Sequence, residues 1–123
     1  NIDNFNKYRQ THGQIPTERV LKKVATVMKE NAIPVGKAAR TGADEFLLLL
    51  PEKNKKEATQ IAERMRRKIE EVLSDEIVED KALTISGGVS ENPIDGATVD
   101  ELLTKAQEAL RQAKTQGKNR IVA

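Results

Sequence analysis

The chain has 123 residues, the length of one domain, so a single hydrophobic core is expected. Its residues are 37% hydrophobic and 33% charged, a composition that excludes an intrinsically disordered segment. The net charge of +2 results from 21 basic and 19 acidic residues that are interspersed along the chain, so no extended field for nucleic acid or anionic lipid is predicted.

Two further features of the composition limit the function. The absence of cysteine excludes disulfides, cysteine nucleophiles and thiolate metal sites, and it agrees with a cytoplasmic location. No apolar run approaches the roughly 20 residues that span a bilayer, so no direct membrane contact is expected. The densest basic cluster, residues 64–68, alternates with acids and lacks aromatic neighbours, which favours a solvated helix face over a nucleic-acid interface.

The first half of the chain predicts a helix, a hairpin and a second helix. Apolar residues return on one helical face from Val20 to Met28, after a proline suited to the first turn. Residues 37–50 indicate a hairpin with Gly42 to Asp44 in its turn, and the run from Leu47 to Leu50 is interpreted as a buried strand. From residue 55 to 73 apolar residues recur at intervals of three and four, which predicts a long amphipathic helix.

The second half predicts a strand, a helix and a closing strand. Residues 82–90 read as a strand in which Gly87 and Gly88 mark a bulge or a close backbone approach. Residues 99–114 place apolar residues from Val99 to Ala113 on one helical stripe, and a left-handed cap is expected at Gly117 before a strand over 120–122. This order indicates an α+β fold in which helices flank a mainly antiparallel central sheet.

The most promising site is the stretch R-T-G-A-D-E-F at residues 40–46, which places two adjacent carboxylates, Asp44 and Glu45, at the hairpin turn. Mg²⁺ favours one or two carboxylates completed by phosphates and water, so such a pair can hold the cation beside a phosphorylated substrate. Gly42 lets a nucleotide approach the backbone closely. Acids at turns are common, and a merely solvated polar turn stays an alternative.

The same stretch resembles the GGDEF signature of diguanylate cyclases. Four other blocks resemble that family in its own order: residues 1–5 (N-I-D-N-F), 11–13 (T-H-G), 83–89 (L-T-I-S-G-G-V) and 109–120 (A-L-R-Q-A-K-T-Q-G-K-N-R). Together these blocks span nearly the whole chain. The resemblance implies a GGDEF-type domain with a nucleotide-cyclase-like, ferredoxin-like core.

The resemblance also implies a reaction and a metal site. In the family, two GTP-loaded domains meet face to face, and each 3′-hydroxyl attacks the α-phosphate of the opposite GTP with the help of two divalent cations. The implied metal ligands are Asn1, the backbone carbonyl of Ile2, and Asp44, while Glu45 assists metal binding and helps to deprotonate the hydroxyl. Because Asn1 offers a neutral oxygen where the family has an aspartate, a weakened Mg²⁺ site is expected.

The implied nucleotide contacts are Gly42 and Ala43 at the turn, Arg9 and Glu18 at the guanine, and Lys114 and Lys118 at the phosphates. Ala43 adds a methyl group where the family has glycine, and Arg9 replaces an amide that both donates and accepts hydrogen bonds. Lys118 keeps the charge of the usual arginine but loses its fork of donors. The family's product-inhibition motif, R-x-x-D, would fall on residues 33–36, where neither charge is present, so cyclic di-GMP binding by that route is not expected.

These substitutions favour a degenerate GGDEF domain of bacterial cyclic di-GMP signalling. We expect a catalytically weak or inactive regulatory or dimerisation module that binds GTP or a related nucleotide. One alternative is an active diguanylate cyclase, and another is a purely structural interaction domain. The retained Asp44 and Lys114 agree with nucleotide binding and with structural retention alike.

Family members carry a helix and a central first strand before the D-I-D element with which this chain begins. We therefore expect residues 1–123 to form a single domain that lacks these two elements. Either they precede Asn1 in a longer protein, or the fold has lost a central strand, in which case two copies are expected to exchange strands. The former is favoured, because an open slot at the centre of a sheet would expose unpaired backbone groups.

Overall fold

The computed structural model describes residues 1–32 and 36–123 and has the predicted α+β architecture. The described helices are α1 (Phe5–His12), α2 (Gln14–Ala32), α3 (Lys55–Val72) and α4 (Val99–Thr115). The described strands are β1 (Lys37–Arg40), β2 (Phe46–Leu49), β3 (Ile77–Val78), β4 (Lys81–Ala82), β5 (Gly87–Gly88) and β6 (Ile121–Val122). In this part of the chain no helix is long and apolar enough to cross a membrane.

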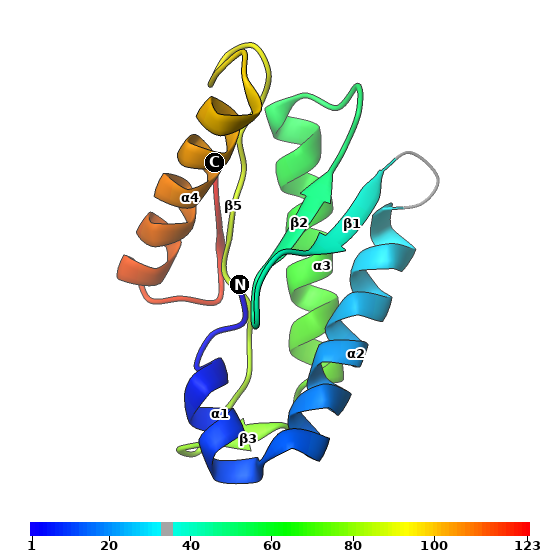
Figure 1. Ribbon diagram of the computed structural model, residues 1–123, viewed down its shortest axis with the longest axis vertical. Helices are drawn as coiled ribbons and strands as arrows, with labels where there is room; N and C mark the ends of the chain where they lie inside the picture. Colours follow the sequence, from blue (N-terminus) through cyan, green and yellow to red (C-terminus); the bar gives the residue numbers. More distant parts are fainter. Residues whose placement is uncertain (33–35) are drawn as a thin grey trace.

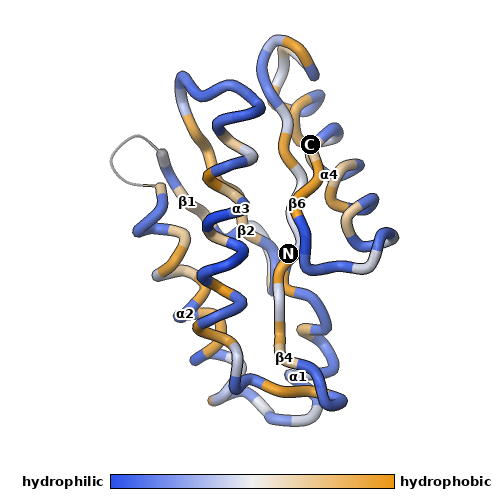
Figure 2. Tube along the Cα trace, turned by 180° about the vertical axis from the view of Figure 1, so that it is seen from behind, coloured by the Kyte–Doolittle hydropathy of each residue, from blue (hydrophilic) through white to orange (hydrophobic). Residues whose placement is uncertain are grey.

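Apart from α1, β3 and β4, the described elements form two groups with the chain start between them (Figure 1). One group consists of α2 and α3 packed together, with the hairpin β1–β2 lying on α2. The other consists of α4 packed on β5 and β6. In Figure 2 hydrophobic residues gather on the strands and on parts of the helices, while most of the connecting loops are hydrophilic. Because the start of the chain lies between the two groups, both of them can contact it.

The strands confirm the predicted β1–β2 hairpin and correct the strand expected over residues 82–90. Strands β1 and β2 pair antiparallel, from Lys37 opposite Leu49 to Arg40 opposite Phe46, so the predicted hairpin and its turn are confirmed. Strands β3 and β4 form a second antiparallel hairpin that was not predicted, but β5 and β6 pair in parallel. The single strand expected over 82–90 is wrong, since it is divided into β4, a bridge between Ile85 and Ile2, and β5.

The helix boundaries follow from their caps. The side chain of Asn54 accepts from the backbone N–H of Glu57, and the Glu57 side chain accepts in return from the Asn54 N–H, which is a capping box at the start of α3. Thr98 caps α4 through the N–H of Glu101. Gly117 follows α4 with a φ of 124°, so the expected glycine stop is confirmed. The first helix, α1, was not among the elements that the periodicity of apolar residues predicted.

The core lies between α1, α2 and α3 and includes the first residues of the chain. Its buried members are Ile2, Phe5, Tyr8, Val20, Val24, Val27, Met28, Met65, Ile69, Leu73, Val78 and Leu83. The expectation that Leu47 to Leu50 is buried is wrong in part, because Leu47 and Leu49 are exposed, Leu49 by 59%. Side chains alternate along a strand, so Phe46 and Leu48 pack on the core and their neighbours point away from it. Val99 at the start of α4 is likewise 71% exposed and does not belong to the buried stripe.

A buried carboxylate joins α1 and α2 to the segment before β3. Glu76 is only 4% exposed and accepts from the Tyr8 hydroxyl at 2.8 Å and from Arg19 Nη2 at 2.8 Å. Burial opposes its charge, but the hydrogen bonds from Arg19 and Tyr8 outweigh burial and hold the pKa of this carboxyl below its ordinary 4.5. Burial and the same bond raise the pKa of Tyr8 to about 12.

We expect Gly88→Ala to destabilise the domain by about 3 kcal/mol or more, because a Cβ at Gly88 would lie 2.0 Å from the backbone oxygen of Ala106 and 2.5 Å from the nitrogen of Leu110. Gly87→Ala is the matched control, since its Cβ would meet only the end of the flexible Ile121 side chain, at 2.8 Å. Thermal unfolding followed by circular dichroism measures both. Equal losses for the two variants would contradict the close approach of β5 to α4.

A second prediction concerns alkaline pH. Unfolded Tyr8 ionises near its ordinary pKa of 10.0 and folded Tyr8 near 12, so its contribution to stability is complete below pH 10 and is lost as the pH rises toward 12. In Tyr8→Phe this loss, up to about 2–3 kcal/mol, should disappear. At neutral pH the variant should be less stable by about 1–2 kcal/mol, because buried Glu76 loses a donor. Urea unfolding of both proteins across this pH range measures the difference, and parallel alkaline losses would refute it.

Candidate functional site

The turn between β1 and β2 is held in shape by Arg40. Its Nε donates to the Gly42 carbonyl at 2.9 Å and its Nη2 donates to the Ala43 carbonyl at 2.8 Å. At the base of the turn, the Thr41 N–H donates to the Glu45 carbonyl at 2.9 Å, and the Thr41 hydroxyl donates to Glu45 Oε2 at 3.0 Å. These bonds give the loop that carries the two acids one defined shape.

The start of the chain lies against this turn. The carbonyl of Asp44 accepts from the Ile2 N–H at 3.0 Å and from Asn1 Nδ2 at 3.2 Å. The Ile2 side chain is buried in the core, and among the described residues its carbonyl accepts no backbone hydrogen bond. The three expected metal ligands are therefore neighbours in space although 43 positions separate Asn1 from Asp44.

Two lysines from the end of α4 also reach the start of the chain. Lys114 Nζ donates to the side-chain oxygen of Asn1, and Lys118 Nζ donates to Asn4 Oδ1 at 3.1 Å. Both positive charges thus lie beside the segment that is expected to hold the metal. The Asn1 amide oxygen is already engaged by an ammonium group.

The donors at the turn fit Mg²⁺ in kind but supply little negative charge. In residues 1–32 and 36–123 there is no group of three or more His, Cys, Asp or Glu side chains that could hold a metal ion. A cation here would have the Asp44 carboxylate as its one acidic ligand, assisted by Glu45, together with the Ile2 carbonyl, the Asn1 amide oxygen and oxygens of a ligand. All of these are hard oxygen donors, the class that Mg²⁺ prefers.

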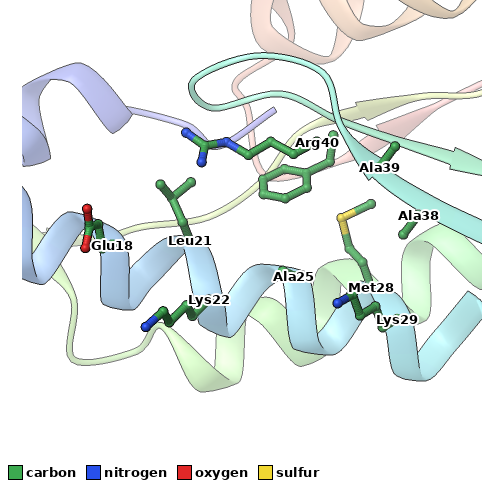
Figure 3. Close-up of a pocket in the computed structure, with 10 residues that line it drawn as sticks. Glu18, Leu21, Lys22, Ala25, Met28, Lys29, Ala38, Ala39 and Arg40 are labelled. Atoms are coloured by element: carbon green, nitrogen blue, oxygen red, sulfur yellow. The ribbon is translucent and has the colours of Figure 1, made fainter.

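A hollow of about 480 Å³ lies between α2 and the hairpin. Its lining residues are Glu18, Leu21, Lys22, Ala25, Met28, Lys29, Ala38, Ala39, Arg40 and Phe46. Figure 3 shows Arg40 reaching from β1 over Leu21, toward the end of α2 that carries Glu18. An apolar floor with a carboxylate and a guanidinium at one end suits a planar ring that has polar edges.

Arg9, the other residue expected at the base, lies elsewhere. It does not line the hollow. Its Nη2 donates to Asn6 Oδ1 at 3.2 Å, and its guanidinium carbon lies 5.8 Å from the centroid of the Phe5 ring. The structure thus brings the turn, the chain start and Lys114 together, whereas Arg9 does not line the hollow that Glu18 lines.

Three residues at the site were left without a role by sequence reasoning. Arg40 donates hydrogen bonds within the turn, and the Asp3 carboxylate accepts a hydrogen bond from the backbone N–H of Asn119. A carboxylate between Ile2 and Phe5, both apolar, was the one available signal that Asp3 is buried. Nothing in the sequence predicts the long-range hydrogen bonds of Asn119 to Asp3, Arg66 and Glu70.

Comparison with known proteins assigns the family. Residues 1–120 match the family described as "Diguanylate cyclase, GGDEF domain". The chain belongs to the GGDEF domain family. The turn at residues 40–46 is thus the signature turn of a GGDEF domain, and the α+β fold is the one expected for this family.

Curated relatives and solved structures agree with this assignment. The chain is 32% identical to Diguanylate cyclase A of Treponema denticola and 31% identical to the response regulator PleD of Caulobacter vibrioides, in each case over 98% of the chain. It spans only 32% and 27% of the length of these relatives.

Among solved structures, diguanylate cyclase SiaD of Pseudomonas aeruginosa, crystallised with its activator SiaC, superposes with a TM-score of 0.84 at 29% identity over 99% of this chain and 46% of that one. The GGDEF domain of DgcB from Caulobacter crescentus, in complex with c-di-GMP, gives 0.81 at 27% identity over 99% of this chain and 72% of that one.

Proposed function

We propose that this GGDEF domain takes part in bacterial cyclic di-GMP signalling as a module that binds GTP with Mg²⁺ weakly and has little or no diguanylate cyclase activity. In this role it regulates or dimerises the protein that contains it, and it works in the cytoplasm. The observation that carries the proposal is Asn1, which offers no carboxylate at a position expected to bind metal and whose side-chain oxygen accepts a hydrogen bond from Lys114.

The electrostatics of the site support the loss of catalysis. In the family's reaction, carboxylates offset part of the positive charge of two divalent cations. Asp44 alone offsets less of this charge than a pair of acidic ligands would. The ammonium of Lys114 beside Asn1 adds positive charge at the same place. Fewer negative charges lower cation affinity and weaken the stabilisation of the transition state, in which the 3′-oxygen bonds to the α-phosphorus as the bond to pyrophosphate breaks.

The retained groups support nucleotide binding. Lys114 and Lys118 lie together at one side of the chain start, where they can attract a triphosphate. The hollow between α2 and β1 offers Glu18 as an acceptor for the edge of a guanine ring. Arg9 does not line this hollow, so guanine would be recognised without the amide that family members use.

An active diguanylate cyclase is the second candidate. It is supported by the proximity of Asn1 to Asp44 and by Glu45, whose carboxylate accepts a hydrogen bond within the same turn. In an active enzyme Glu45 would help to take the proton of the attacking hydroxyl. Measured turnover distinguishes the two candidates.

The first experiment is titration calorimetry with GTP, ATP and cyclic di-GMP in Mg²⁺. We expect GTP to bind with a Kd of the order of 10–100 μM, and Asp44→Ala to abolish this binding because the only carboxylate among the expected ligands is lost. Asp75→Ala, a change of an exposed acid on another loop, is the control and should bind like the wild type. Absence of binding by any nucleotide would instead favour a purely structural domain, and rapid formation of cyclic di-GMP would establish the second candidate.

Asn1→Asp tests the cause of the weak site directly. A carboxylate at position 1 should tighten Mg²⁺-dependent GTP binding about tenfold, or about 1.4 kcal/mol, because it restores a formal charge next to the cation. Titration of Mg²⁺ at constant GTP measures the change, and chromatography detects any cyclic di-GMP formed. An unchanged Mg²⁺ dependence would show that Asn1 does not limit the site.

A further inference from the structure

Asp3 carries a carboxylate that is only 2% exposed, directly after the two residues expected to bind metal. Its Oδ2 accepts from the Thr84 hydroxyl at 2.8 Å, and its Oδ1 accepts from the Ser86 hydroxyl at 2.8 Å. The backbone N–H of Asn119 donates to the same carboxylate at 3.1 Å. Within the described part of the chain no basic side chain forms an ion pair with it.

A buried carboxylate without a cationic partner is costly unless its oxygens are hydrogen-bonded. Three donors from two distant segments satisfy Asp3, and bonds to a charged acceptor are stronger than neutral ones. A shift of either segment would remove at least one of these donors from the buried charge and would therefore be costly. Asp3 therefore fixes both segments relative to the start of the chain.

The turn that Asp3 holds is also anchored to α3. Lys118 and Asn119 both have positive φ angles, 65° and 49°, so the turn adopts a conformation that needs support. The Asn119 side chain accepts from Arg66 at 2.8 Å and donates to Glu70 at 2.6 Å. Asn119 thus connects α3 to Asp3 through one residue.

The position of this clamp relates it to the site. The turn begins after Lys114 and contains Lys118, the two lysines that reach Asn1 and Asn4. Asp3 is connected to the turn of the lysines by its hydrogen bond from Asn119, and it directly follows the expected metal ligands Asn1 and Ile2 in the chain. The spacing between the two lysines and the expected metal ligands therefore depends in part on the Asp3 carboxylate.

We infer that Asp3, with Asn119 as its partner, is a positioning residue that sets Lys114 and Lys118 at the right distance from Asn1 and Ile2 for a metal-bound triphosphate. The inference rests on the proposed function for the identity of the ligand. The clamp itself is a property of the protein and is measurable without a nucleotide.

The test compares Asp3→Asn with Glu76→Gln. Each variant neutralises one buried carboxylate without changing its size, but Glu76 contacts Tyr8 and Arg19 and none of the lysines of the site. Both should lower the melting temperature. With calorimetry well below that temperature, Asp3→Asn should weaken GTP binding about tenfold or more, since misplaced contacts are costly. Binding of GMP should change less than about twofold, because GMP lacks the distal phosphates, and Glu76→Gln should bind both like the wild type.

A readout without nucleotide separates this inference from the proposed function. In Asp3→Asn the amide of Asn119 should lose its protection from hydrogen exchange, while the amides of α3 keep theirs. If the wild type does not bind GTP, the proposed function fails, and the exchange measurement alone decides the clamp: lost protection supports it and unchanged protection overturns it. If the wild type binds GTP, equal affinities in wild type and Asp3→Asn overturn the positioning role. Equal losses of GTP affinity in Asp3→Asn and Glu76→Gln overturn it as well.

Discussion

The site depends on hydrogen bonds that tie the first three residues to segments far along the chain. Asp3 accepts from Thr84 and Ser86, 81 and 83 positions away, and from Asn119, 116 positions away. Asn1 and Ile2 donate to Asp44 in the hairpin turn. These bonds place the hairpin turn, which belongs to one group of elements, relative to the turn after α4, which belongs to the other.

Because of these bonds, we expect a substitution of one polar residue at the site to displace several segments at once. A charged acceptor such as Asp3 fixes its donors in both distance and direction, whereas the apolar contacts of Ile2 and Phe5 fix only proximity. Arg40 acts similarly on the turn, because its guanidinium binds two carbonyls at once. Shape at this site is therefore determined by a few polar groups, and the core behind them supplies stability.

The sequence was sufficient to predict what depends on local patterns. The long helices and the hairpin have strong periodicity or a clear turn, and α2, α3, α4, β1 and β2 were predicted close to their observed bounds. The strand expected over 82–90 was wrong because its pairing is decided by distant partners, Ile2 for Ile85 and β6 for β5. The exposure of Leu47 and Leu49 was missed for a related reason, since a run of leucines does not reveal which face of a strand is covered.

For the candidate site too, the sequence predicted what depends on local motifs and missed what depends on distant contacts. The motif residues Asp44, Glu45 and Lys114 could be named from resemblance, but the contact between Lys114 and Asn1 and the burial of Asp3 come from three-dimensional packing. The expected R-x-x-D position falls on residues 33–36, of which 33–35 lie outside the described residues, so that expectation stays a prediction. The lack of a leading helix and strand stays a prediction as well.

Under the proposed function, the contact between Lys114 and Asn1 links phosphate binding to metal binding. The ammonium occupies the amide oxygen that a cation would use, and a phosphate offers that ammonium a charged acceptor in place of a neutral one. A phosphate that takes Lys114 away from Asn1 would free the amide oxygen for the cation. Asparagine at position 1 thus offers a cation a neutral oxygen where an aspartate would offer a formal charge, which agrees better with weak, reversible binding than with catalysis.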